Sequence, residues 1–135
     1  MRKMTISAAA MAIGGLMFAV APAAQACVTS TFTGNYSVTF TGFVGNLTLN
    51  AEALLIANGA GGFTGQISYE KNGNLHRNLT LSGSWSLNSN CTGSGSITNS
   101  VLGTVNFDFT LNPKGKVING VETDSGTAVT LTGTR

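Results

Sequence analysis

Charged side chains are scarce in this sequence and make up only 9% of its 135 residues. The formal net charge is +2, but Arg2 and Lys3 precede an apolar N-terminal run, and the other five basic residues balance the five acidic ones. A neutral domain lacks the clustered positive charge that binds nucleic acids and anionic membrane surfaces. We therefore expect no nucleic-acid partner, and no later apolar run is long enough for a membrane span.

Histidine and cysteine are also rare, with His76, Cys27 and Cys91 as the only examples. The single histidine gives no recognisable serine–histidine–acid triad, and no histidine–cysteine cluster has the spacing of a metal site. The alternation of its neighbours places His76 on the polar face of a strand with Ser68 and Glu70, where a solvated histidine is expected. The sequence therefore predicts no catalytic residue, no metal and no cofactor.

The N-terminus has the pattern of a secretory signal peptide. A basic start precedes an apolar run over residues 6–20, and Ala24-Gln25-Ala26 forms an A-x-A cleavage site. The pattern predicts that residues 1–26 are removed and that residues 27–135 form a single domain. We therefore expect an exported protein, either periplasmic or extracellular.

The two cysteines allow two interpretations. Export leads to an oxidising compartment, in which a Cys27–Cys91 disulfide would persist. The alternative is a lipoprotein with an acylated Cys27. A lipobox normally has leucine three residues before the cysteine, and this sequence has Ala24 there, followed by the polar Gln25. The sequence therefore favours the disulfide and leaves the lipid anchor as the alternative.

Apolar and polar residues alternate along the mature chain in about eight short runs, which is the pattern of half-buried strands. Glycine-containing turn sequences separate the runs. Evenly spaced antiparallel strands with such turns favour a barrel. We therefore predict an all-β fold, an antiparallel meander barrel of about eight strands. The aromatic residues expected inside it are Tyr36, Phe40, Trp85, Phe107 and Phe109.

The turn at Asn72-Gly73 determines which neighbouring residues share a face. A two-residue loop would pair Ile67 with Asn78. A three-residue loop beginning at Lys71 instead brings the following leucines onto the face of Ile67. Since a one-residue slip exchanges the two faces of a strand, the apolar pattern predicts the three-residue loop.

Arg77 interrupts the apolar pattern of its strand, because it shares the phase of Leu79 and Trp85. An inward arginine needs an anion, carbonyl groups or water. It could bind the carboxylate of an amphipathic molecule bidentately. The alternative is an arginine near the strand end that extends to solvent at the rim. The candidate ligand-binding residues are Arg77, Tyr69, Trp85, Phe107 and Phe109.

Several short sequence motifs are distributed along most of the mature chain. They include GNYSV at 34–38, GGFTG at 61–65, LSGSW at 81–85, FDF at 107–109 and DSG at 124–126. Their order and spacing resemble a group of bacterial exported proteins with an allene-oxide-cyclase-like barrel, a calycin-type fold. The resemblance implies the fold, and it implies no particular activity or site residue.

Three functions remain open at this point. The leading hypothesis is a non-enzymatic protein that binds a small apolar or amphipathic ligand or has a structural role in the cell envelope, since small barrels either fill with side chains or hold one ligand. The first alternative is a cyclase or isomerase of the allene oxide cyclase type, acting in an apolar barrel cavity. The second is a fimbrial or adhesin-like subunit, with a sheet edge completed by another chain.

Overall fold

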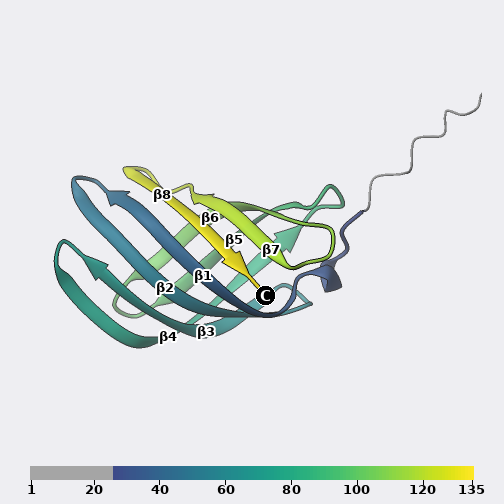
Figure 1. Ribbon diagram of the computed structural model, residues 1–135, viewed down its shortest axis with the longest axis horizontal. Helices are drawn as coiled ribbons and strands as arrows, with labels where there is room; N and C mark the ends of the chain where they lie inside the picture. The colour runs from purple at the N-terminus through teal and green to yellow at the C-terminus, as the bar shows by residue number, and fades with distance from the viewer. Residues whose placement is uncertain (1–25) are drawn as a thin grey trace, which may run out of the picture.

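The computed structural model describes residues 26–135. The predicted signal peptide therefore lies outside the described residues, except for Ala26. The described chain forms a closed barrel in which every strand pairs with the next and β8 pairs with β1, all antiparallel (Figure 1). The predicted all-β meander barrel of about eight strands is confirmed.

A 3-10 turn, η1 (Thr29–Thr31), precedes eight strands joined by short connections. Among residues 26–135, no helix is long and apolar enough to cross a membrane. The strands are β1 (Thr33–Val44), β2 (Leu47–Asn58), β3 (Gly62–Lys71), β4 (Asn74–Leu87), β5 (Thr92–Asn99), β6 (Gly103–Leu111), β7 (Val117–Glu122) and β8 (Thr127–Thr134).

Large rings inside the barrel lie across from glycines on neighbouring strands. Phe109 lies between Gly93 of β5 and Gly120 of β7, and Phe107 lies across from Gly95. A Cβ atom on Gly93 would lie 2.6 Å from the Cζ atom of Phe109, so a larger residue there would displace the ring. Rings and glycines therefore interdigitate and fill this part of the interior.

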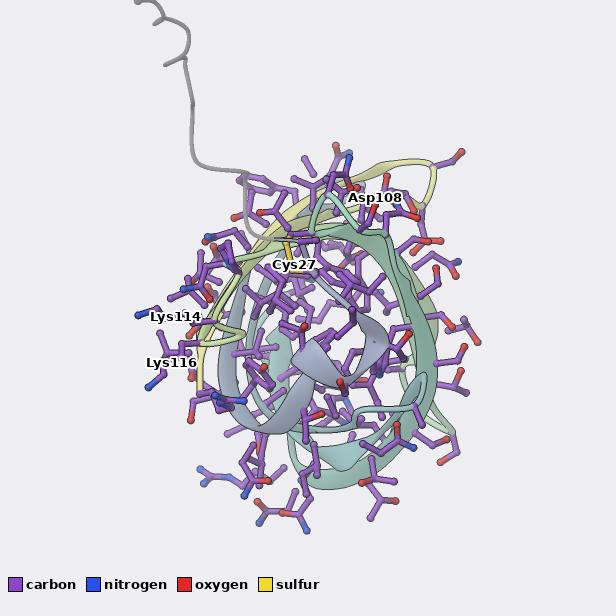
Figure 2. The ribbon with its side chains drawn as sticks, turned by 90° about the vertical axis from the view of Figure 1, so that its right-hand side faces the viewer. Cys27, Asp108, Lys114 and Lys116 are labelled. Carbon is purple, nitrogen blue, oxygen red and sulfur yellow. A yellow bond between two sulfur atoms is a disulfide. The ribbon has the colours of Figure 1, made fainter. Side chains whose placement is uncertain are left out.

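The predicted inward aromatic residues are confirmed, since all five are buried. Alternation along β6 explains the pattern there, because successive side chains point to opposite faces of a strand. Asp108, between the buried Phe107 and Phe109, is exposed on the outside of the barrel (Figure 2).

The N-terminal segment closes one end of the barrel. Phe32 is fully buried at 0% exposure, and its ring centroid lies 4.8 Å from that of Trp85 and 5.0 Å from that of Tyr36. Figure 2 looks onto this end and shows the η1 turn lying across the ring of strands. We call residues 27–32 the plug, because they carry Phe32 into the interior.

A disulfide attaches the plug to the barrel. Cys27 is bonded to Cys91 in the β4–β5 connection, with a Cα–Cα distance of 5.1 Å. The backbone N–H of Cys27 also donates a hydrogen bond of 3.0 Å to the carbonyl of Ser89. The predicted disulfide is confirmed, and it occupies the sulfur atom that a lipid anchor on Cys27 would require.

The β3–β4 hairpin differs from the sequence prediction. Its loop has two residues, Asn72 and Gly73, with φ angles of 53° and 86°. Positive φ at both positions is typical of a type I′ turn. A β-bulge then sets Arg77 and Asn78 across from the single residue Ser68. Because of this extra residue, the apolar side chains farther along β4 face inward again. The prediction had explained their inward direction by a three-residue loop.

Between the turn and the bulge, the residues of β4 lie on the face opposite to the one predicted from the sequence. Leu75, predicted to face inward, is 53% exposed. His76, predicted to lie on the polar face, is directly across from Tyr69, and the two rings stack with centroids 4.8 Å apart. Arg77 is exposed, which agrees with an arginine that extends to solvent and not with one that points into the barrel. The prediction assumed uninterrupted alternation, which one inserted residue shifts by one position.

Candidate functional site

The end of the barrel opposite the plug contains a cavity of about 250 Å³. Its apolar walls come from several strands and include Phe40, Ile67 and Ile97. The β5–β6 and β7–β8 connections contribute to its mouth, at the left of the barrel in Figure 1. The volume lies just below the range of roughly 300–1,000 Å³ for typical ligand pockets, which suits a small molecule.

One position in the cavity wall is a small residue between two rings, although most of the lining residues are larger. Ala51 of β2 lies between two aromatic residues, Phe40 of β1 and Tyr69 of β3, and contributes only a methyl group. The other half is filled by Phe32 from the plug and by the rings around it. Within the described chain, only the plug end has such an inserted segment, so the opposite end stays open.

Glu122 lines this cavity from β7. It lies directly across from Phe107, whose ring is inside the barrel, and opposed residues share a face of the sheet. Burial, and to a smaller extent the negative charge of Asp124, raises the pKa of Glu122 to about 7. In residues 26–135, neither a hydrogen-bond donor nor a cation opposes this rise. The cavity therefore contains a half-buried carboxyl group without a stabilising partner.

Two further charged residues line the mouth. Asp124 accepts hydrogen bonds of 2.9 Å and 2.8 Å from the backbone and side-chain amides of Asn106, which hold its carboxylate in place. Lys71 lines the mouth from β3. Strands β3 and β7 are four positions apart in a ring of eight, so they form opposite walls. The acidic residues therefore lie on one side of the mouth and the amine on the other.

Ionisation of Glu122 is expected to lower the stability of the protein as the pH rises. Its folded pKa of about 7 exceeds the ordinary value of 4.5, so its stabilising contribution is full below pH 4.5 and is lost as the pH passes through 7. Because the carboxyl group is half-exposed, the loss should be about 1 kcal/mol. Thermal unfolding at about pH 5 and about pH 8 measures it.

Two variants distinguish the effect of Glu122 ionisation on stability from that of the other acidic residues. Glu122→Gln should show a smaller decline in Tm between these pH values than the wild type. Glu52→Gln, on the outer face of β2, should keep the wild-type decline. An unchanged decline in Glu122→Gln would contradict the assignment.

Comparison with known proteins identifies the fold. No protein-family model and no curated protein matches the chain. Two solved structures are similar, each with a TM-score of 0.53 and covering 79% of this chain. One is a redesigned beta barrel, mFAP1, bound to DFHBI, with 17% identity and 97% of its length covered. The other is a redesigned beta barrel, b11L5F_LGL, with 22% identity and 93% covered.

The shared feature is the closed β-barrel. At such low identity the likeness shows the fold alone, and nothing in it identifies a family. Residues 26–135 also contain no group of three or more histidine, cysteine, aspartate or glutamate residues that could hold a metal ion.

The structure does not bring the five predicted ligand-binding residues together. Tyr69 lines the cavity. Trp85, Phe107 and Phe109 lie in the packed aromatic cluster of the barrel interior, with Trp85 and Phe109 directly against Phe32. Arg77 is exposed on the bulge of β4 and is not part of the cavity wall.

Sequence reasoning missed Glu122 because alternation along residues 117–122 did not decide which side chains face inward. In the structure Val121 is 48% exposed, whereas Ile118 is fully buried. Both phases of this short strand contain apolar residues, so alternation alone does not choose between them. The available signal was Gly120, since a glycine on the phase of Ile118 and Glu122 leaves room for an inward ring nearby.

Proposed function

We propose that the protein is an exported β-barrel that binds a small apolar or amphipathic molecule in the cavity at its open end. The observation that carries this proposal is the cavity itself, with apolar walls and a few polar residues at its mouth. Small-molecule sites in proteins have this composition. The DFHBI-bound barrel provides a precedent for ligand binding by the same fold.

Export forms part of the proposal and has two kinds of support. The Cys27–Cys91 disulfide is compatible with an oxidising compartment. The N-terminal sequence has the features of a cleaved signal peptide, with cleavage before Cys27. The mature protein would then be one barrel domain over residues 27–135. Its order of motifs supports a proposed relationship to exported proteins with an allene-oxide-cyclase-like barrel.

Filling the cavity is expected to weaken ligand binding. Ala51→Leu adds three carbon atoms to a wall residue, and overpacking of this kind costs about 1–3 kcal/mol, which corresponds to a loss of affinity of roughly 5- to 150-fold. Indole serves as a neutral probe, and its binding is followed by NMR titration. In the wild type, the shifting signals should include Phe40, Ile67 and Ile97.

Asn50→Leu is the matched control, because it places the same side chain on the outer face of β2 and should bind indole as the wild type does. Thermal unfolding confirms that both variants fold. Equal titration of Ala51→Leu and the wild type would show that the ligand binds elsewhere. Absence of indole binding by the wild type would count against the proposed function.

A second candidate function is catalysis of the cyclase or isomerase type. Its specific support is the Glu122 carboxyl group, which lines an apolar cavity and has a pKa of about 7. Such a group can accept or donate a proton at neutral pH. Mass spectrometry and NMR of the recovered ligand distinguish the candidates, since a binding protein returns it unchanged and an isomerase returns a different structure of the same mass.

The fimbrial or adhesin-like hypothesis finds no support in the strand pairing. Such a subunit needs an open sheet edge for another chain. Here the pairing of β1 with β8, from Ser37↔Thr134 to Val44↔Thr127, closes the sheet on itself.

A further inference from the structure

The carboxyl group of Glu122 is the starting point for identifying the ligand. It reaches the cavity from a strand position opposite an inward ring, and among the described residues no donor or cation stabilises its charge. A half-buried carboxylate is favourable once a charged donor pairs with it, and charge-assisted hydrogen bonds are about twice as strong as neutral ones. A ligand that carries a cationic N–H donor would supply this partner.

The other charged residues at the mouth favour the same ligand charge. Asp124 follows Glu122 closely in the chain and adds a second negative charge on that wall. Its hydrogen bonds with Asn106 leave acceptor capacity, because a carboxylate has about four lone-pair sites. The one lysine lining the cavity, Lys71, lies on the opposite wall. A cation beside Glu122 would therefore meet two acids at close range.

The deeper part of the cavity requires an apolar group. Phe40, Ile67 and Ile97 form its walls, and the volume of about 250 Å³ admits only a small molecule. Burial of a hydrocarbon or aromatic group there is favourable in proportion to its apolar area. Tyr69, with His76 stacked on it, adds an aromatic face on the β3 side.

We infer that the ligand is a small amphipathic amine, with its ammonium group between Glu122 and Asp124 and its apolar part in the cavity. This inference rests on the proposed function, because it concerns the same cavity. It reverses the charge expected from the sequence, in which Arg77 was the candidate partner for a carboxylate. The exposed position of Arg77 and the cavity position of Glu122 cause this reversal.

Three probes of similar size and different charge test the inference on the disulfide-bonded protein. They are 2-phenylethylamine, 2-phenylethanol and 3-phenylpropanoate, whose dissociation constants are measured by NMR titration at pH 8. The amine should bind about tenfold more tightly than the alcohol, and the carboxylate should bind most weakly. Equal binding of the amine and the alcohol, or tightest binding of the carboxylate, would overturn the inference while the proposed function stands. If none of the three probes binds while indole does, the inference is overturned and the proposed function stands; if indole does not bind either, both are contradicted.

The pH dependence of amine binding, together with one variant, identifies the side chain that binds the ammonium group. Since the pKa of Glu122 is about 7, the ionised fraction rises about tenfold between pH 6 and pH 8, and amine affinity should rise by a similar factor. The other ionisable residues near the cavity are Asp124, Lys71, Tyr69 and His76.

Glu122→Gln should weaken amine binding about tenfold at pH 8, remove its rise with pH and leave alcohol binding unchanged. Glu52→Gln, on the outer face, should behave as the wild type does. A rise in amine affinity that persists in Glu122→Gln would assign the titration to another residue and overturn the role of Glu122.

Discussion

Replacing Phe32 with alanine is expected to lower the free energy of unfolding by roughly 3–5 kcal/mol. The ring is fully buried and contacts those of Tyr36, Phe63, Trp85 and Phe109. It enters the barrel from its end and contributes no strand pairing, so its loss leaves a cavity that neighbouring strands cannot readily close. Equilibrium unfolding in urea measures the change.

Phe43→Ala provides a matched control, because it makes the same substitution at a phenylalanine that is 51% exposed. We expect a loss below about 1 kcal/mol there. A similarly small loss for Phe32→Ala would show that the plug is not part of the cooperative core.

Removing the disulfide should have an effect of similar size. The Cys27–Cys91 bond joins residues with a sequence separation of 64. Loss of that constraint on the unfolded chain should lower the free energy of unfolding by about 4 kcal/mol. The double variant Cys27→Ser/Cys91→Ser, compared with the wild type in urea unfolding, measures this change.

Reduction of the wild type with dithiothreitol should lower its midpoint towards that of the double variant, whose own midpoint should not respond to reductant. A wild-type midpoint that is insensitive to complete reduction, checked by thiol alkylation, would contradict a stabilising role for the bond.

The two losses should not be additive. Cys27 and Phe32 belong to the same short plug, and the bond holds the segment that inserts the ring. Without the bond, the plug loses more conformational entropy when the protein folds. This loss offsets part of the stabilisation that burial of Phe32 provides. The triple variant should therefore lose less stability than the sum of the separate losses.

The plug also explains why the candidate site lies at one end of the barrel and not at the other. At its end, Phe32 occupies the space between the strands and completes the aromatic cluster. At the other end, Ala51 leaves room between the flanking rings, and Glu122 contributes a carboxyl group to the cavity wall. The proposed ligand site and the plug thus lie at opposite ends of one barrel, and variants at one end should affect the other only weakly.

The sequence by itself determined the class of fold, because period-two alternation and regularly spaced turn residues are local properties of a strand. The same alternation correctly placed Phe107 and Phe109 inside the barrel. The two cysteines, together with an N-terminal sequence that predicts export, were enough to predict their bond.

Only the tertiary structure decided the position of the site. The bulge at Arg77 and Asn78 depends on how β4 pairs with β3, so local alternation placed Arg77 on the wrong face. The inward phase of Glu122 depends on the partners of β7. The cavity depends on side-chain volumes contributed by strands far apart in the chain. Faces, registers and empty space are properties of paired strands, which is why one strand's sequence did not reveal them.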